Sequence, residues 1–126
     1  MKCFDPFTPE EAISYALVGG TVLRRQARKH GLGSGQLHTL LCLYMLTNTQ
    51  STRYVQAGIL AQAVDVTTSL FRAHIRDLLH VDLIQRIALA PREARLLGVT
   101  ESGQEIARSY LLAMGRRAHI FQRLCL

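Results

Sequence analysis

A run of hydroxyl and arginine side chains near the middle of the chain has the composition of a surface that binds a polyanion. The run opens with Thr67, Thr68 and Ser69, continues with Arg72 and Arg76, and contains no Asp or Glu. Small hydroxyl side chains fit close to phosphates and base edges, and the arginine fork donates two parallel hydrogen bonds to either group. We therefore expect contact with nucleic acid; a merely solvated helix face is the alternative.

The apolar spacing around this run predicts two short helices, over about 55–64 and 68–80. Asp65 can adopt the left-handed conformation in a tight turn between them, and Thr67 can cap the second helix. The inward face is expected to consist of Phe71, Ile75, Leu78 and Leu79, supported by Leu60, Val64 and Val66. This arrangement leaves the hydroxyl and arginine side chains outside, as in the second helix of a helix-turn-helix that enters the major groove.

A β-hairpin is expected next, from segments 83–89 and 95–99. Arg92 and Arg95 flank its tip, and a basic tip can enter the minor groove or lie along phosphates. The composition of the tip is ordinary for a surface loop. We consider it a candidate nucleic-acid contact only because it comes directly after the reading helix. Residues 55–99 together predict a winged helix-turn-helix.

Two long helices, over 8–30 and 101–124, are expected to frame this unit and are candidate dimerisation helices. Thr8 and Glu11 form a capping box for the first, which ends near a glycine, Gly31, that can adopt the left-handed conformation. The two expected apolar stripes are Ile13, Ala16, Leu17, Gly20, Leu23 and Ala27 on the first helix, and Ile106, Tyr110, Ala113, Met114, Phe121 and Leu124 on the last, which Thr100 caps.

A further helix, from the cap Ser34 to about Thr47, is apolar on almost every side, which places it at the centre of the core. The polar run 47–52 after it is expected to be a loop. In the first long helix, Gly19 and Gly20 lower the helix propensity and imply either a kink or a close crossing with another helix. The fold class is therefore mainly α with a small β-hairpin wing (α+β).

The composition fits a single winged-helix domain over residues 1–126, which is long enough to bury a core without disulfides or metals. The 15 Lys and Arg residues exceed the 9 Asp and Glu, for a net charge of +6, and arginine supplies 13 of the 15. No apolar run approaches the ~20 residues of a membrane span, and the first residues lack the apolar core of a signal peptide. We expect a cytoplasmic protein without membrane contact, whose basicity suits nucleic acid.

Motifs of catalysis and metal binding do not occur in the sequence, which contains no glycine-rich phosphate loop, paired zinc-type cysteines or HExxH. His38 and Cys42, four residues apart, supply only two ligands. We expect no enzyme activity, no cofactor and no metal. Cys42 is expected to be a buried thiol, whereas Cys3 and Cys125 leave redox sensing open if the two termini meet.

A second basic block, residues 24–29, ends the first long helix. No Asp or Glu occurs between Glu11 and Asp65, so this region is locally positive. The cations can simply complement the negative end of the helix dipole. Alternatively, they contact flanking phosphates or an acidic partner, and both interpretations stay open at this point.

Several of these segments together resemble the MarR family of bacterial transcription regulators, over about residues 37–107. The shared features are a Leu-Ala helix, a Val-Thr turn, a reading helix, a wing arginine and a Thr-x-x-Gly start of the last helix. The matching segments are Leu60–Ala61, Val66–Ser69, Phe71–Ile84, Arg92 and Val99–Gly103. The family pattern has glycine where this chain has Asp65 and Asp82, an Asp where it has Pro91, and a longer segment after the start of the last helix.

The resemblance implies a homodimer that regulates transcription, as a repressor, by binding a pseudo-palindromic double-stranded DNA site. The reading helix would enter the major groove, the wing arginine the minor groove, and the terminal helices would form the dimer. A small-molecule effector would sit between the first, second and last helices. The residues expected to meet DNA are Thr67, Thr68, Ser69, Arg72, Arg76, Arg92 and Arg95. The alternative from another class is a winged-helix module that binds a protein and has no DNA binding of its own.

Overall fold

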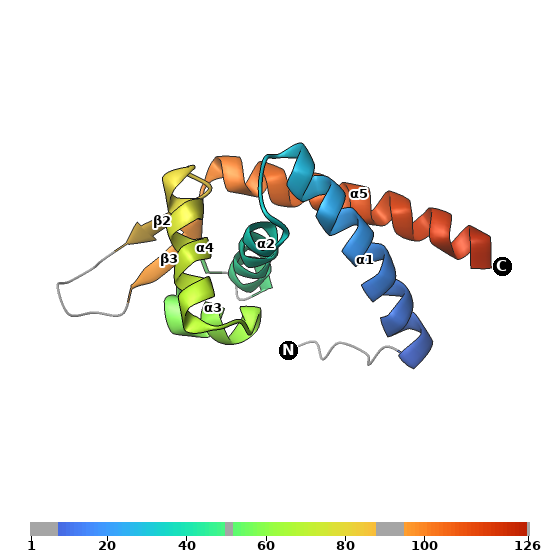
Figure 1. The fold of residues 1–126 in the computed structure, drawn as a ribbon, viewed down its shortest axis with the longest axis horizontal. Coiled ribbons are helices and arrows are strands. Elements are labelled where there is room, and N and C mark those ends of the chain that lie inside the picture. Colours follow the sequence, from blue (N-terminus) through green and yellow to red (C-terminus); the bar gives the residue numbers. More distant parts are fainter. Residues whose placement is uncertain (1–7, 50–51, 88–94, 126) are drawn as a thin grey trace.

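The computed structural model describes residues 8–49, 52–87 and 95–125 (Figure 1). Its elements are α1 (Pro9–Lys29), α2 (Ser34–Thr49), β1 (Val55–Gln56), α3 (Ala57–Val64), α4 (Thr68–His80), β2 (Ile84–Ile87), β3 (Leu96–Val99) and α5 (Glu101–Cys125). The strands form an antiparallel sheet in the order β1-β3-β2. Figure 1 shows α3, α4 and the sheet at one end of the molecule and the diverging helices α1 and α5 at the other. The predicted winged helix-turn-helix with long terminal helices is confirmed.

The α2 helix runs through the centre of the core, as its apolar circumference predicts. Leu37, Leu40 and Leu43 are completely buried. The helix contacts α1, α3, α4, α5 and β3, so that it joins the sheet end of the molecule to the two long helices. In the described ranges, no helix combines the length and the hydropathy that crossing a bilayer requires.

The long helices α1 and α5 cross closely where the sequence has paired glycines. A Cβ atom at Gly19 would lie 3.7 Å from the Cε of Met114 and 3.7 Å from the hydroxyl oxygen of Tyr110. Gly19 thus lies within van der Waals distance of α5, in a helix that runs unbroken from Pro9 to Lys29. The most buried side chains of α1 are Val18, Val22 and Ala27.

A third strand, β1, occupies the start of the segment that was expected to be helix. Val55 pairs with Leu97 of β3 in antiparallel register. The chain can approach β3 closely because Gly98 has no side chain: a Cβ there would lie 2.7 Å from the ring of Tyr54 and 2.8 Å from the carbonyl oxygen of Arg53. Pairing with a partner distant in sequence therefore overrides the local helical pattern.

The predicted caps and the left-handed turn residue are confirmed. The hydroxyl oxygens of three threonines accept backbone N–H groups: Thr8 from Glu11, Thr67 from Leu70 and Thr100 from Gly103. Asp65 has a φ of 55° after α3, and Asp82 has a φ of 61° after α4. Aspartate tolerates this conformation better than most residues, which explains how it replaces the family's glycine at both turns.

Several predicted details of the helices are wrong. Ser34 is the first residue of α2 and not its cap; instead the side chain of Gln36 accepts the N–H of Gly33 at 3.0 Å. The α2 helix continues to Thr49, into the expected loop. Val66, expected on the inner side of the helix-turn-helix, is 39% exposed. Ile13, Leu17 and Leu124, from the apolar stripes of the two candidate dimerisation helices, are exposed within one chain. Val66 lies in the turn between α3 and α4, whereas the exposed stripe residues lie on α1 and α5, where the neighbouring elements decide which side of a helix is covered. The side chains of Phe121 and Cys125 and the whole of Cys3 lie outside the description.

Candidate nucleic-acid interface

The outer face of α4 presents the predicted hydroxyl and arginine side chains to solvent. The exposed residues of this reading face are Thr67, Thr68, Ser69, Arg72 and Arg76, and beneath them Phe71, Ile75 and Leu78 are buried. The hydroxyl residues stand at the start of the helix, where free N–H groups and the positive end of the dipole favour an anion. The arginines follow one and two turns later, on the same side.

The carboxylate nearest to this face is held on the inner side of α4. Oδ2 of Asp77 accepts a hydrogen bond from Nε2 of Gln36 in α2 at 2.9 Å. Its Oδ1 lies 3.9 Å from Nε of Arg76, and a pair this exposed contributes little. In the part of the chain that the structure describes, no other Lys or Arg has a carboxylate within 4.0 Å. The arginines of the reading face therefore have no strong carboxylate partner among the described residues and can contact a ligand.

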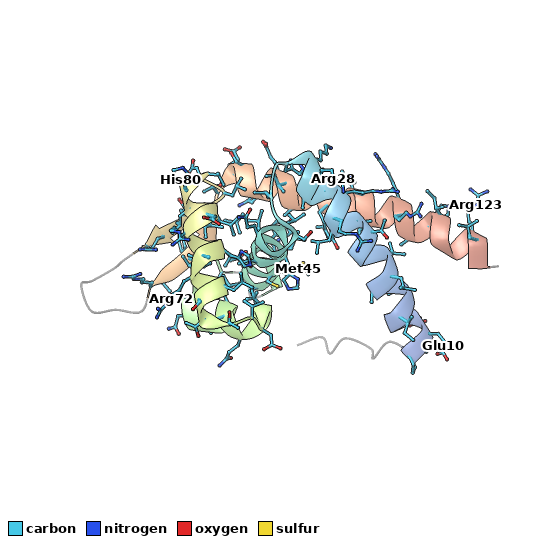
Figure 2. All side chains as sticks on the ribbon, viewed as in Figure 1. Glu10, Arg28, Met45, Arg72, His80 and Arg123 are labelled. Atoms are coloured by element: carbon cyan, nitrogen blue, oxygen red, sulfur yellow. The ribbon has the colours of Figure 1, made fainter. Side chains whose placement is uncertain are left out.

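A groove of about 830 Å³ lies between α4, α3 and the sheet. Its floor is apolar, and its rim carries arginines from α4, from β2 and from the residue that precedes β3. The lining residues are Ala57, Gly58, Ala61, Thr68, Phe71, Arg72, Ile75, Arg76, Leu79, His80, Arg86, Arg95 and Leu97. Figure 2 shows Arg72 and His80 along α4 beside the sheet. The fold thus gathers four cations at one groove.

The turn that follows α4 is hydrogen-bonded to Thr100, the residue before α5. The hydroxyl of Thr100 donates to the carbonyl of Asp82 at 2.8 Å, and its N–H donates to the carbonyl of Leu83 at 3.1 Å. A Cβ atom at Gly103 would collide with that same Leu83 carbonyl oxygen. This contact couples the position of the reading helix to the long helix α5.

The structure brings some of the predicted DNA-contacting residues together and adds others. Thr68, Arg72, Arg76 and Arg95 line the groove, whereas Thr67 and Ser69 lie on the exposed start of the reading face outside it. Arg92 lies outside the described residues, so its predicted role as the wing arginine stays a prediction. We use the name reading surface for this exposed set, the groove included.

Sequence reasoning missed Arg86 and His80 as parts of this groove. Arg86 stands in β2 opposite Leu97, two residues after the buried Ile84. Because alternate residues of a strand share a face, this two-residue step was the signal that could have placed the arginine beside α4. His80 is the last residue of α4, one turn after Arg76, and its helical spacing carried the same information.

A second, apolar cavity of about 470 Å³ lies between α1, α2 and α5. It is lined by Gly19, Gly20, Leu23, His38, Leu41, Cys42, Met45, Leu46, Ala63 and Tyr110. Burial raises the pKa of the Cys42 thiol and that of the Tyr110 hydroxyl, so both groups are neutral at physiological pH. Within the described residues no three His, Cys, Asp or Glu side chains gather as metal ligands.

No protein-family model and no curated protein matches the chain. Solved structures do match it. A MarR-family transcriptional regulator from Silicibacter pomeroyi superposes with a TM-score of 0.63 at 17% identity, over 84% of this chain and 66% of that one. MepR of S. aureus, in a complex with DNA, gives a TM-score of 0.66 at 18% identity, over 86% and 77% of the two chains. NadR in complex with 4-hydroxyphenylacetate gives 0.67 at 12% identity, over 100% and 86%.

The fold is that of the MarR regulators. The predicted resemblance, drawn from residues 37–107, is thereby confirmed at the level of the fold. Superposition on the MarR fold extends beyond those residues to the long terminal helices, since NadR covers the whole of this chain.

Proposed function

We propose that the chain is a MarR-type transcription regulator that binds double-stranded DNA as a homodimer. The observation that carries the proposal is the reading surface: four arginines and three hydroxyl residues that meet on a MarR fold, with one weak carboxylate contact among them. A MarR-fold protein in complex with DNA, MepR, is among the structures that the chain resembles. Fold and surface chemistry therefore support the same ligand.

In the proposed complex the start of α4 enters the major groove. Thr68 and Ser69 lie closest to the helix N-terminus and would meet base edges or phosphates, and Arg72 would follow one turn deeper. Arg86 and Arg95, on the sheet side of the groove, would contact the DNA backbone and hold α4 in register. The wing arginine Arg92 would enter the adjacent minor groove.

The proposed dimer uses the diverging helices α1 and α5. Large apolar side chains are exposed along both, namely Ile13, Leu17, Leu111, Ile120 and Leu124. Complete burial of such a side chain stabilises an interface by about 1.5–3 kcal/mol. A second copy that covers these residues would also place two reading helices on one pseudo-palindromic site.

The apolar cavity between α1, α2 and α5 is the proposed site of a small-molecule effector. Its lining is almost entirely apolar, with the Tyr110 hydroxyl as a polar group. NadR is a MarR-fold protein that binds 4-hydroxyphenylacetate, a small aromatic acid. A ligand between α1 and α5 would shift α5 and, through Thr100 and Gly103, the end of α4. We propose that the protein is a repressor and that such a ligand causes it to dissociate from DNA.

A mobility-shift selection from random duplexes tests the function. We expect enrichment of two similar half-sites separated by about one or two helical turns, as a symmetric dimer requires. The affinity for the selected duplex should fall steeply with salt, with a log-log slope of about −0.9 for each phosphate contact. Failure to bind any duplex at low salt would refute the proposal and would favour the protein-interaction module.

A further inference from the structure

A second cationic groove, which we call the α1–α5 groove, lies between the two long helices. It is lined by Gln26, Lys29, Glu105, Arg108, Ser109, Leu112, Ala113 and Arg116, and its volume is about 350 Å³. The hydroxyl of Ser109 donates to Oε1 of Gln26 at 3.0 Å and so joins the two helices. In Figure 2, Arg28 marks the meeting of α1 with α5, well apart from Arg72 on α4.

The surroundings of this groove are almost purely positive. The basic block 24–29 lies at the end of α1, and α5 adds Arg108, Arg116 and Arg117 some 80 residues later in the sequence. No Asp or Glu follows Glu11 in α1, and none follows Glu105 in α5. The side chains of Lys29, Arg108 and Arg116 are exposed and have no described carboxylate within 4.0 Å. The guanidinium of Arg108 donates to Oε1 of Gln104 at 3.1 Å, and Glu105 is the one carboxylate residue in the lining. Three cationic residues against one carboxylate give the groove an excess of positive charge, which favours an anionic ligand.

An exposed leucine separates the two arginines of the groove. Arg108, Leu112 and Arg116 follow each other at four-residue steps on one face of α5, which sets the arginines about 12 Å apart. Leu112 is 64% exposed. The groove thus presents a cation, an apolar side chain and a second cation in a row.

We propose that the α1–α5 groove binds an acidic amphipathic helix of a partner protein. Such a helix lays its apolar residue on Leu112 and brings one carboxylate to Arg108 and another to Arg116, two turns apart, as helix-in-groove recognition does elsewhere. A DNA backbone supplies the negative charge but no apolar group to cover Leu112. A second copy that docked on this groove with the same face of its own α5 would bring Arg108 and Arg116 against their counterparts, and like charges repel.

The pattern of the groove defines the probe that tests it. The probe is a fluorescein-labelled 18-residue helical peptide with two glutamates eight residues apart and a leucine midway on the same face. The comparison peptide has the same composition in shuffled order. In fluorescence anisotropy at low salt, we expect the patterned peptide to bind at least about fivefold more tightly than the shuffled one, a difference of the size that one buried apolar contact gives.

Two variants of the groove should weaken this binding without unfolding the chain, since all three side chains are exposed. Arg108→Gln combined with Arg116→Gln should lower the affinity at least about tenfold, because two charge pairs are lost. Leu112→Gln should abolish the preference for the patterned peptide and leave the salt dependence intact. Arg72→Ala combined with Arg76→Ala serves as the matched control and should leave peptide binding unchanged. Thermal unfolding midpoints confirm that each variant is folded.

Three results would overturn the inference. Equal binding of the shuffled peptide would reduce the groove to a non-specific cationic surface. Loss of duplex affinity in the Arg108 and Arg116 double variant would make the groove a nucleic-acid contact. A fall in molar mass by light scattering in Leu112→Gln would make it an interface between copies. The proposed DNA binding depends on Arg72 and Arg76, whereas the proposed helix binding depends on Arg108 and Arg116. The experiments can therefore refute one proposal without refuting the other.

Discussion

The reading surface and the α1–α5 groove are both rich in arginine, yet they differ in construction. On the reading surface the cations accompany hydroxyl groups at a helix N-terminus, over a floor of buried apolar side chains. In the α1–α5 groove they alternate with an exposed leucine along the middle of a long helix. The comparison teaches that positive charge alone does not identify a ligand. The groups between the cations, hydroxyl in one case and apolar in the other, distinguish phosphate and base edges from a protein helix.

The sharpest way to break this comparison is to remove two arginines from each surface in turn. Arg72→Ala with Arg76→Ala should lower the affinity for the selected duplex by about 100-fold, because each arginine contact to a base contributes about 1–3 kcal/mol. The matched Arg108→Ala with Arg116→Ala variant of the α1–α5 groove should change duplex affinity by less than about twofold. Fluorescence anisotropy with labelled duplex measures both. Equal losses in the two variants would show that the surfaces act as one.

The packing of the start of α5 against Leu83 and Val99 can be tested at Gly103. In Gly103→Ala the new methyl group meets the carbonyl of Leu83 and the Cγ1 of Val99, so we expect a loss of about 1–3 kcal/mol in the free energy of unfolding. The control is Gly115→Ala in the same helix, where a Cβ meets nothing within 4 Å. That change should stabilise by up to about 1 kcal/mol, because alanine favours the helix. Urea denaturation measures both, and a stable Gly103→Ala protein would contradict the described contact of α5 with Leu83 and Val99.

A single arginine that only the structure revealed sharpens the boundary of the reading surface. Arg86→Ala should reduce the log-log salt slope of duplex binding by about 0.9, as the loss of one phosphate contact does. Arg116→Ala, an exposed arginine of the α1–α5 groove, should leave the slope unchanged. Titrations at several salt concentrations check this pair. An unchanged slope in Arg86→Ala would show that Arg86 makes no phosphate contact and that the DNA-binding surface does not extend from α4 to β2.

The smallest expected effect concerns the end of α1 that carries the basic block. Burial, and then the charge of Lys29, lowers the pKa of His30, whose Nε2 is buried without a hydrogen-bond partner among the described residues. The folded state therefore favours neutral His30. This preference stabilises the folded state fully at pH values above about 6.5, the ordinary pKa of histidine in the unfolded chain. The stabilisation is lost as the pH falls from there to the lower pKa that His30 has in the folded state.

We thus expect the thermal unfolding midpoint to decrease when the pH is lowered from 7.5 to 5.5. The decrease should be smaller in His30→Gln. The difference between the two proteins isolates this histidine from the four others in the chain. Parallel curves for the two proteins would show that burial of His30 has no influence on stability.

Local chemistry made much of the fold predictable. Thr8, Thr67 and Thr100 satisfy N–H groups within three residues of themselves, so their caps could be read without knowing the rest of the molecule. Asp65 follows a helix at a turn and adopts the left-handed conformation that its side chain tolerates. The exposed positions of Arg72 and Arg76 followed from the helical period of the buried residues around them.

What could not be predicted depended on partners distant in sequence. The strand at Val55 exists because β3, some forty residues later, offers its edge and a glycine. Ile13 and Leu17 share the spacing of an apolar stripe, but Val18 and Val22 are the side chains of α1 that the neighbouring helices bury. Arg86 joins the reading surface only because β2 pairs beside α4.

The sequence by itself determined the helices, their caps, the turn before α4 and the chemistry of its outer face, because each depends on contacts within a few residues. Only the tertiary structure decided which cations share a groove. Lys29 at the end of α1 and the arginines of α5 are some 80 residues apart in the chain, and the packing of α1 on α5, with its Ser109–Gln26 hydrogen bond, places them in one groove. A groove is a property of packing between elements, and packing follows shape and burial over the whole core, which no local pattern contains.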